Sequence, residues 1–431
     1  MKHSIYNSLI ELPRKRYLLY NAFTDMYLVL SQKLHEVLEQ QSDDYIQERF
    51  PKFYEQLLTT GCFIEDSVNE VTLLSNRIHQ MDHSDSTYQL CINPTINCNF
   101  KCWYCYEEHI PKSKMQPDTL ERVKKHITSI IEGQNIERFD LSFFGGEPLL
   151  YFKEVVHPVM QHCNTVCADK GIATTISFTS NGYLINDDML LILKDNKVDY
   201  FQITLDGNKE QHNKVRYPFV GGDSYDKIVT NIKRLIGIGV KVLLRINYTK
   251  ENLLDVKHIA EDLKDLSTDN KSNLSVNFQR VWQDETQDNT IPEEWLDSCM
   301  DVFYNLGIVV THRCMDQVTS SCYADKVNQA LINYNGDVFK CTARDFKHES
   351  CLGRLDEAGQ IIWDKSQMER RANLRFKKEI CHQCRVAPLC GGGCSQRIME
   401  NKNNETCIYG YNDEGIDSVV LDRFYNRVVR K

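Results

Sequence analysis

Six short β-rich runs alternate with helical patterns between residues 87 and 306, and this alternation constrains the fold more than any other feature. The strands are expected at Gln89–Asn93, Asp140–Phe144, Thr174–Phe178, Tyr200–Leu205, Val240–Asn247 and Leu274–Gln279. The helices are expected at 117–132, 152–169, 186–195, 225–237, 252–265 and 293–306. Strands that each precede a helix favour parallel pairing, in a doubly wound sheet or a barrel. In a barrel, chemistry gathers at the C-terminal ends of the strands.

Two further segments flank this α/β region, so we expect domains at 1–80, 87–307 and 310–431. The first segment is predicted to be a small α+β domain. Its strands are expected at Arg16–Tyr20 and Met26–Leu30, its helices at 31–39 and 53–61, and extended runs at Cys62–Ile64 and Val71–Leu74. The last segment is rich in cysteine and glycine and short of periodic apolar runs. We expect its fold to depend on inorganic ligands.

Composition limits the class of protein. A chain of 431 residues can hold two or three domains. Its 42% hydrophobic and 26% charged residues are ordinary for a globular protein, and the net charge of −9 does not suggest nonspecific nucleic-acid binding. The sequence contains no apolar run of about 18 residues, and its first residues lack the apolar core of a secretory signal. We therefore expect a cytoplasmic protein that binds neither membrane nor nucleic acid.

Cysteine is unusually abundant, with 17 residues that gather toward the C-terminus. Disulfides explain such density in small secreted domains but not in a large chain without a signal, so metal ligation is the better explanation. Six of the cysteines fit no ligand spacing and are expected to be mostly buried, inert thiols: Cys62, Cys91, Cys163, Cys167, Cys299 and Cys351.

Cys98, Cys102 and Cys105 follow the first expected strand of the α/β region directly. Thiolates are the usual ligands of a cubane iron–sulfur cluster, which needs four. Three closely spaced cysteines leave one iron open to a small molecule. A zinc knuckle also uses cysteines at such spacing and stays an alternative on this triplet alone.

The spacing of these cysteines, with Tyr104 before the last, resembles the radical S-adenosylmethionine (radical SAM) superfamily. The resemblance implies a partial (β/α)6 barrel and a [4Fe–4S] cluster whose open iron is chelated by SAM. It also implies cleavage of SAM into methionine and a 5′-deoxyadenosyl radical that abstracts hydrogen from a substrate.

Polar and glycine residues end the next three expected strands. The run Gly145-Gly146-Glu147-Pro148 resembles the family motif that contacts the amino group of SAM. By the same resemblance Ser180, Asn181 and Asp206 contact ribose or methionine, although Asp206 also suits a cap of the following turn. Arg216 resembles a basic residue that holds the SAM carboxylate. Arg245 and Asn247, on the fifth strand, are expected to point to the same mouth.

Seven cysteines recur at set spacings toward the C-terminus, with Gly336 between the first two: Cys322, Cys341, Cys381, Cys384, Cys390, Cys394 and Cys407. Their pattern resembles that of SPASM domains, which carry two auxiliary [4Fe–4S] clusters. Together the two resemblances cover about residues 88 to 410. They imply that Cys314, Cys322, Cys341 and Cys394 hold one cluster, and Cys381, Cys384, Cys390 and Cys407 the other. The eighth ligand is expected upstream of the seven, where Cys314 is better placed than Cys299; if Cys314 is not a ligand, one iron is open to substrate. His382 is expected to lie outside the ligand set.

SPASM enzymes mostly act on peptides or proteins, and residues 1–80 resemble the PqqD-like, winged-helix-like module that pairs a leader peptide with a strand edge. Maturation of a ribosomally made precursor peptide, by a thioether or carbon–carbon crosslink or another oxidation, is the first hypothesis. A reductant such as flavodoxin or ferredoxin would be a second partner.

Two alternatives stay open. An anaerobic sulfatase-maturing enzyme forms formylglycine, but that group usually has an aspartate directly after the cysteine equivalent to Cys341, where this chain has Thr342. Asp345 is then a candidate base. The other alternative is a polycysteine zinc protein without enzymatic activity.

Overall fold

The computed structural model describes residues 1–284, 291–311, 321–401 and 406–429. Contacts within the chain divide it into two compact units. Unit 1 comprises Met1–Ser84, Arg313–Val327 and Ser366–Lys431, and unit 2 comprises Asp85–His312 and Asn328–Lys365. The division into three domains stays a prediction.

Unit 2 is built on a parallel sheet whose strands run in the order β14-β13-β12-β10-β9-β8-β6. Its strands are β6 (Thr87–Ile92), β8 (Arg138–Phe143), β9 (Ala173–Ser180), β10 (Tyr200–Leu205), β12 (Lys241–Tyr248), β13 (Leu274–Arg280) and β14 (Val309–Thr311). The six predicted strands are thus confirmed, and the sheet is that of a radical-SAM-type partial barrel. Among the described residues, β14 and β6 are not paired with each other, so the sheet does not close.

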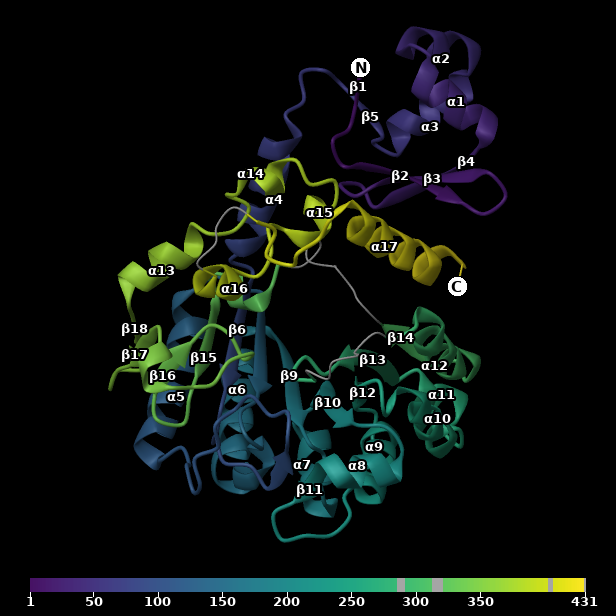
Figure 1. Cartoon of the computed structure of the whole chain (residues 1–431). Helices are drawn as coiled ribbons and strands as arrows, with labels where there is room; N and C mark the ends of the chain where they lie inside the picture. The colour runs from purple at the N-terminus through teal and green to yellow at the C-terminus, as the bar shows by residue number, and fades with distance from the viewer. Residues whose placement is uncertain (285–290, 312–320, 402–405, 430–431) are drawn as a thin grey trace. The chain divides into compact units, whose positions relative to one another are not determined.

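The predicted helices of this region are also confirmed, and they follow the strands in turn (Figure 1). They are α5 (Pro117–Gly133), α6 (His157–Lys170), α7 (Asp187–Asp195), α9 (Tyr225–Gly237), α10 (Lys257–Leu263) and α12 (Glu293–Asn305). Short turns precede two of them, η1 (Pro148–Tyr151) with η2 (Phe152–Val156) before α6 and η3 (Leu253–Val256) before α10. Their apolar faces pack with the strands in one core. Inside it Phe178 lies between Phe143 and Phe201, with ring centroids 4.9 and 4.6 Å away.

Small elements that the sequence did not predict complete the barrel. The strand β7 (Phe100–Cys102) pairs antiparallel with β11 (Arg216–Pro218), which places Arg216 opposite Cys102. Two short helices, α8 (Lys209–Val215) and α11 (Thr268–Lys271), occupy loops after β10 and before β13.

Part of the cysteine-rich segment extends the barrel sheet. Strand β15 (Gln329–Ile332) pairs parallel with β6, and β16 (Asp337–Phe339), β17 (Gly353–Leu355) and β18 (Ile361–Trp363) continue the sheet antiparallel. The turn η5 (His348–Ser350) lies between β16 and β17. Cys341 therefore lies between β16 and β17 of the sheet whose strand β6 precedes the cysteine triplet.

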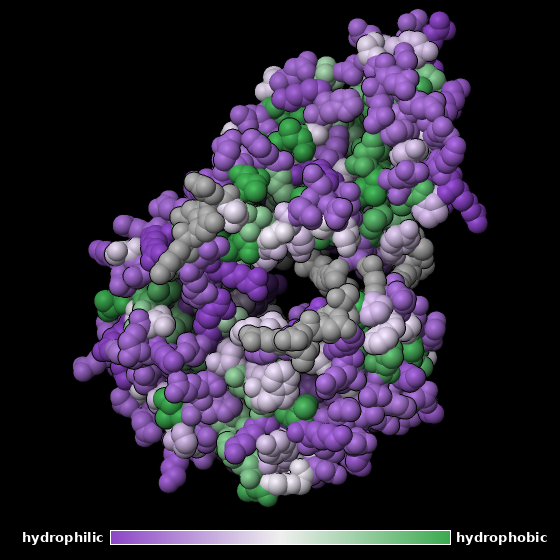
Figure 2. Space-filling view, viewed as in Figure 1, coloured by the Kyte–Doolittle hydropathy of each residue, from purple (hydrophilic) through white to green (hydrophobic). Residues whose placement is uncertain are grey.

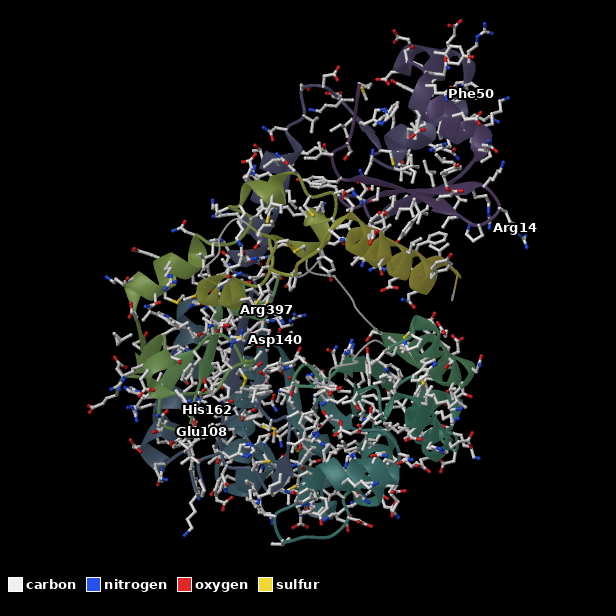
Figure 3. All side chains as sticks on the ribbon, viewed as in Figure 1. Arg14, Phe50, Glu108, Asp140, His162 and Arg397 are labelled. Atoms are coloured by element: carbon white, nitrogen blue, oxygen red, sulfur yellow. The ribbon has the colours of Figure 1, made fainter. Side chains whose placement is uncertain are left out.

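The N-terminal part of unit 1 contains a three-stranded antiparallel sheet, β2 (Asn7–Leu12), β3 (Arg16–Asn21) and β4 (Met26–Ser31). One face packs on α1 (Gln32–Gln40), α2 (Asp43–Arg49) and α3 (Pro51–Thr59), through Leu19, Leu30, Leu57 and their neighbours. The predicted strands and both predicted helices are confirmed here. The short β1 (Lys2–His3) and β5 (Phe63–Ile64) pair with each other. In Figure 3, Arg14 marks the β2–β3 hairpin and Phe50 the start of α3.

The prediction of an extended run at Val71–Leu74 is wrong, because these residues lie in α4 (Glu70–Asp82). Asn69 caps this helix by accepting a hydrogen bond from the Thr72 backbone N–H. Leu74 and Ile78, four residues apart, bury the same helix face. The β preference of this short run was thus outweighed by the helix cap and by the helical spacing of its apolar residues.

The C-terminal part of unit 1 consists of short helices joined by glycine-containing turns. They are η4 (Tyr323–Asp325), α13 (Lys365–Ala372), α14 (Glu379–His382), α15 (Ala387–Cys390), α16 (Ser395–Glu400), α17 (Asp413–Phe424) and η6 (Tyr425–Val429). This part shares a core with the second face of the N-terminal sheet. Ile10 and Leu18 of the sheet meet Leu389 and Val420 in that core. The segment thus buries more apolar surface than its sequence indicated.

The surface is mostly hydrophilic on the face shown in Figure 2, with hydrophobic residues scattered over it. Among the described residues, no helix combines the length and apolar character that a membrane crossing requires.

Candidate functional site

The three cysteines of the triplet lie in one loop at the C-terminal end of β6. Burial raises the pKa of Cys98, of Cys102 and of Cys105, the last to about 11. The neighbouring thiols Cys102 and Cys105 raise the pKa of Cys98 further, so the three sulfur atoms share one environment. Such thiols lose their protons when they bind a metal cation. Three thiols in one loop are donors of the kind that an iron–sulfur cluster needs.

The loop after β8 is pressed against this cysteine loop. Gly145 and Gly146 both have positive φ, and a Cβ at Gly146 would lie 2.1 Å from the carbonyl oxygen of Asn97. The Glu147 backbone N–H donates to that same oxygen at 2.9 Å. The Gly146 N–H donates to a carboxylate oxygen of Glu107 at 2.7 Å. The two glycines are therefore required for the close approach of the two loops.

Glu147 is fully buried and joins the ends of two strands. Its carboxylate accepts hydrogen bonds from the Ser180 hydroxyl at 2.9 Å, the Asn181 backbone N–H at 2.8 Å and the Leu149 N–H at 3.0 Å. Asn181 in turn donates from its side chain to Asn99 at 2.8 Å, between two cysteines of the triplet. The structure thus brings Glu147, Ser180 and Asn181 to the cysteine loop. Their contacts with SAM stay predictions.

Asp206 and Arg216 meet at Tyr104, which stands directly before Cys105. The Tyr104 hydroxyl donates to Asp206 at 2.5 Å and accepts from Arg216 at 2.8 Å. Burial raises the pKa of Asp206 to about 6, against the opposing effect of Arg216. Burial lowers the pKa of Arg216, but the Asp206 carboxylate and the hydrogen bond to the Tyr104 hydroxyl outweigh burial and hold this pKa well above its usual value.

Two atoms of this group have no hydrogen-bond partner among the described residues, namely Oδ1 of Asp206 and Nε of Arg216. Buried polar atoms of this kind are costly unless a ligand engages them. One acceptor and one donor beside the cysteine loop fit a ligand that carries both ammonium and carboxylate groups, as SAM does.

A cavity of about 480 Å³ opens beside Asp206. Its volume lies in the usual range of small-molecule sites, about 300–1,000 Å³. Arg245 donates to Asn247 at 2.9 Å, so these two strand residues do lie together, and Asn247 lines the cavity. The full lining is Trp103, Tyr104, Asp206, Gln211, Val215, Asn247, Thr249, Glu251, Asn252, Val281, Gln283 and Asp284.

Sequence reasoning missed several residues of this site. Gln283 donates to the Tyr104 carbonyl at 2.5 Å, and the Cys105 sulfur lies 3.6 Å from Nε2 of His109. Glu107, whose pKa burial raises to about 7, holds Gly146 as described above. Glu107 and His109 could have been suspected from their place just after Cys105, whereas Gln283 carries no signal in the sequence.

The hairpin that carries Cys341 contacts the same loop. The Tyr106 hydroxyl donates to the Thr342 carbonyl at 2.9 Å, and Lys347 lies 3.2 Å from Glu108. Lys347 also lies 3.1 Å from Asp345, so this carboxylate is partly neutralised. The role of Asp345 as a base stays a prediction.

A second group of thiols gathers in unit 1. Cys381, Cys384, Cys390 and Cys407 line one cavity of about 320 Å³. Burial, together with a smaller effect of the other thiols of the group, raises the pKa of Cys381 to about 11 and that of Cys390 to about 12. Four thiols around one cavity fit the ligand set of a cubane cluster.

The remaining predicted ligands are divided between the units. Burial is the main cause that raises the pKa of Tyr409, and the nearby thiols, Cys322 and Cys394 among them, raise it as well. Both cysteines therefore lie near Tyr409. Cys341 belongs to unit 2, where its sulfur accepts from the Ala343 N–H at 3.3 Å. Cys314 lies outside the described residues. Nε2 of His382 lies 3.1 Å from the Phe376 carbonyl, so this nitrogen has a backbone partner.

Comparison with known families agrees with this geometry. Residues 92–263 match the radical SAM superfamily, and residues 322–385 match the SPASM iron–sulfur cluster-binding domain. A cysteine-type anaerobic sulfatase-maturating enzyme of Clostridium novyi is 32% identical over 347 residues, which are 72% of this chain and 88% of the relative. A relative with the same description from Clostridium perfringens is 23% identical over 364 residues, 75% of this chain and 92% of the relative.

Solved structures show the same fold. Native anSMEcpe with bound AdoMet and Cp18Cys peptide superimposes with a TM-score of 0.59 at 20% identity, over 80% of this chain and 97% of that one. Streptococcus suis SuiB bound to precursor peptide SuiA does so with a TM-score of 0.52 at 16% identity, over 94% of this chain and 98% of that one. These matches identify an enzyme that uses SAM and [4Fe–4S] clusters, and they overturn the alternative of a zinc protein without activity.

Proposed function

Because the chain belongs to the radical SAM maturases that carry a SPASM domain, we propose that it modifies a ribosomally made precursor peptide. The modification would be a thioether or carbon–carbon crosslink, or another oxidation. When bound, the cluster at Cys98, Cys102 and Cys105 supplies the electron that cleaves SAM into methionine and a hydrogen-abstracting 5′-deoxyadenosyl radical.

The chain's own residues would bind and orient SAM. Asp206 and Arg216 offer the unpartnered acceptor and donor described above. Tyr104 fixes both through its hydroxyl group, and Glu147 fixes the ends of β8 and β9. The cavity beside them is lined by Trp103 and Val281, whose apolar surface would exclude water from the reacting atoms.

The observation that carries the peptide proposal is the edge of the N-terminal sheet formed by β4. Among the described residues, β4 pairs with β3 alone, so its outer backbone groups have no strand beside them. An extended leader peptide can add to such an edge through main-chain hydrogen bonds. Met26 and Val29 on this strand are exposed by 44% and 46%. Apolar side chains at an open edge suit a hydrophobic stretch of leader.

The likeness to SuiB supports the same assignment. It spans 94% of this chain, whereas the likeness to anSMEcpe spans about 80%. SuiB was solved with a precursor peptide bound. Because this chain shares the SuiB fold over nearly its whole length, the likeness supports binding of a peptide here as well. A cytoplasmic location and a reductant such as flavodoxin or ferredoxin belong to this proposal.

Formylglycine formation is the second candidate, favoured by the 32% identity to a sulfatase-maturating enzyme. It requires a base near the substrate cysteine or serine. Asp345 would be that base, since it lies on the Cys341 hairpin beside the loop of the cysteine triplet. Thr342, which stands where that group usually has aspartate, weighs against this candidate.

Mass spectrometry distinguishes the two reactions. The reconstituted enzyme is incubated with SAM, a reductant and two substrates, a precursor peptide from its gene neighbourhood and a sulfatase-derived peptide. A crosslink removes two hydrogens, keeps sulfur and gives no reaction with a hydrazide. Formylglycine from cysteine loses the sulfur, and formylglycine from either residue reacts with a hydrazide. Modification of the sulfatase peptide alone would reject the first proposal.

Leader binding is tested separately by fluorescence anisotropy with the labelled leader. We expect Val29→Asp on β4 to weaken binding at least tenfold. Leu191→Asp, on a residue of unit 2 exposed by 64%, is the matched control and should not weaken it. Equal affinities for the two variants would reject β4 as the recognition edge.

A further inference from the structure

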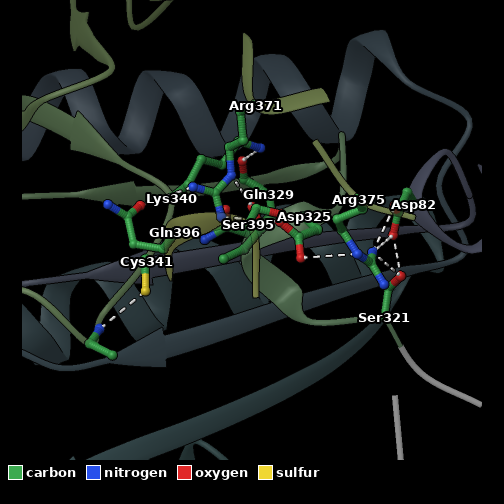
Figure 4. Close-up of polar contacts among 12 residues, drawn as sticks. Asp82, Ser321, Asp325, Gln329, Lys340, Cys341, Arg371, Arg375, Ser395 and Gln396 are labelled. Carbon is green, nitrogen blue, oxygen red and sulfur yellow. Dashed lines mark hydrogen bonds and ion pairs between the residues drawn. The ribbon is translucent and has the colours of Figure 1, made fainter. Parts of the chain in front are cut away.

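A buried network of charged residues lies in unit 1 among the loops that carry the auxiliary-cluster cysteines (Figure 4). Its side chains are Asp82 at the end of α4, Asp325 in η4, Arg371 in α13 and Arg375 just beyond it. Arg371, Arg375 and Asp325 are each only 5% exposed, and Asp82 is 13% exposed. The formal charges of the two arginines and two aspartates cancel, but some of the arginine donor nitrogens have no acceptor in this network.

Arg371 uses all of its donor nitrogens. Its Nε donates to the Ala324 carbonyl at 3.1 Å, Nη1 to the Gln396 side chain at 3.0 Å and Nη2 to Asp325 at 3.1 Å. This arginine therefore needs nothing beyond the protein.

Arg375 differs, because only one of its nitrogens is satisfied. Nη1 donates to both oxygens of Asp82 at 2.8 Å and to the Ser321 hydroxyl at 3.0 Å. Its Nε lies 3.6 Å from Asp325, an ion pair without a hydrogen bond. Nε and Nη2 are buried and have no hydrogen-bond partner in the described part of the chain. A buried guanidinium with idle donors implies a ligand that accepts from them.

One of the idle donors, Nη2, lies beside a cysteine loop. Nη2 lies 2.6 Å from where a Cβ of Gly391 would be, and Gly391 directly follows Cys390. Ser321 directly precedes Cys322, and it also donates to Asp82. Ser395 directly follows Cys394 and donates to Asp325. The network thus contacts residues adjacent to ligands of both predicted auxiliary clusters.

We propose that Arg375 is a positioning residue of the auxiliary clusters whose idle N–H groups donate to cluster sulfur. Its buried positive charge would also raise the reduction potential of the clusters. Reduction adds a negative charge, and a nearby cation with N–H donors stabilises the reduced form. A purely structural brace would need only the bonds from Nη1 to Asp82 and Ser321 and would leave Nη2 without a purpose.

The test measures midpoint potentials by redox titration monitored with electron paramagnetic resonance, on the full chain reconstituted without oxygen. Arg375→Met removes the charge and the donors, and Arg375→Lys keeps the charge but loses the planar set of donors. We expect both variants to shift an auxiliary-cluster potential to more negative values, Arg375→Met further than Arg375→Lys. The SAM-binding cluster, recognised by its spectral change with SAM, should keep its potential.

Arg370→Met is the matched control, because Arg370 lies in α13 close to Arg375 but is exposed, and within the described part of the chain its side chain donates only to the Met399 carbonyl. It should shift no potential. Iron and sulfide counts verify that each variant carries all clusters. Fully loaded Arg375 variants with wild-type potentials would overturn the proposal.

Asp82→Asn covers the case in which neither Arg375 variant holds its clusters. It removes the carboxylate that offsets the same guanidinium, so an auxiliary potential should shift to more positive values. An unchanged potential, or loss of iron from all three variants, would assign the network a structural role alone and overturn the tuning role.

Discussion

The two cysteine sites are held in different ways. The triplet of unit 2 lies in a loop bound to its neighbours by the protein itself, through Glu147, Asn181 and the Tyr104–Asp206–Arg216 group. In the Cys381 group of unit 1, two cysteines lie on helices of four residues each and the other two lie outside helices and strands. Such short helices have little stability of their own.

This difference predicts which fold depends on its metal. The barrel core is made of apolar side chains, and hydrogen bonds between protein groups hold the triplet loop, so we expect the triplet site to form before the cluster binds. The thiols of the Cys381 group pack against the core shared with the N-terminal sheet, where Cys381 and Cys384 adjoin residues such as Leu389. Metal binding at this second site therefore contributes to folding as well as to chemistry.

The strongest test of the triplet site in unit 2 replaces Cys98, Cys102 and Cys105 together by alanine. Release of 5′-deoxyadenosine should fall to background, because the cluster has lost all its protein ligands, while the barrel stays folded. Chromatography of the reaction measures the first effect, and hydrogen exchange of β8 and β9 measures the second. Undiminished release would contradict the cluster assignment, and unfolding of these strands would contradict the idea of a pre-formed site.

The corresponding double variant in unit 1 is Cys381→Ala with Cys384→Ala. We expect faster hydrogen exchange in β2, β3 and α17, because these elements share one core with the two thiols. Cys163→Ala with Cys167→Ala is the control, since this buried pair lies in α6 of unit 2 and is no predicted ligand. Unaltered exchange in unit 1 would show that its core is stable without the metal.

The sequence predicted the barrel because each of its strands and helices has a strong local period. It did not predict α4, because the cap at Asn69 competes with β-favouring residues such as Val71 and Thr72. It also missed the short pair β7–β11, whose three-residue strands leave no periodic signal.

The candidate site shows the same limit. Residues such as Glu147 and Asp206 were predicted because their motifs, placed after strands, resemble those of the radical SAM superfamily. The motif could not show that the Glu147 carboxylate accepts hydrogen bonds from Ser180 and Asn181. Gln283 was missed because its contact with Tyr104 joins residues 179 positions apart. Contacts of this range depend on tertiary packing, which spacing does not encode.

The close approach of the two loops in unit 2 is tested by Gly146→Ala. An added Cβ would meet the Asn97 backbone, and the positive φ of 31° strains any other residue. We expect a loss of about 2–3 kcal/mol in the free energy of unfolding, together with weaker SAM binding. Gly133→Ala is the control, because nothing lies within 4 Å of its Cβ position at the end of α5. Denaturant titration measures stability and calorimetry measures SAM binding. Equal stability of the two variants would contradict the close packing of the two loops.

The smallest expected effect concerns an ion pair of unit 1 that does not involve metal. Asp25 accepts from Arg423 at 2.7 Å through both carboxylate oxygens, and Arg427 adds a further contact. Burial would raise the pKa of Asp25, but Arg423, Tyr20 and Arg427 together lower it below its usual value. A carboxyl with a lowered pKa stabilises the folded state above its unfolded pKa, and this contribution is lost as the pH falls through the folded value.

Asp25→Asn should therefore reduce the free energy of unfolding of unit 1 by about 1–2 kcal/mol at pH 7. Asparagine tolerates the positive φ of 60° at this position, so backbone strain does not add to the effect. The difference from the wild type should shrink as the pH falls below about 4, because the unfolded chain then binds the proton first, and it should vanish below the lowered folded pKa, where the native carboxyl is protonated as well. Hydrogen exchange of α17 at both pH values measures it, since this helix carries Arg423. A difference in stability that persists unchanged in acid would mean that the packing of α17 depends on apolar contacts. Unit 1 would then depend less on charged groups than the triplet site of unit 2 does.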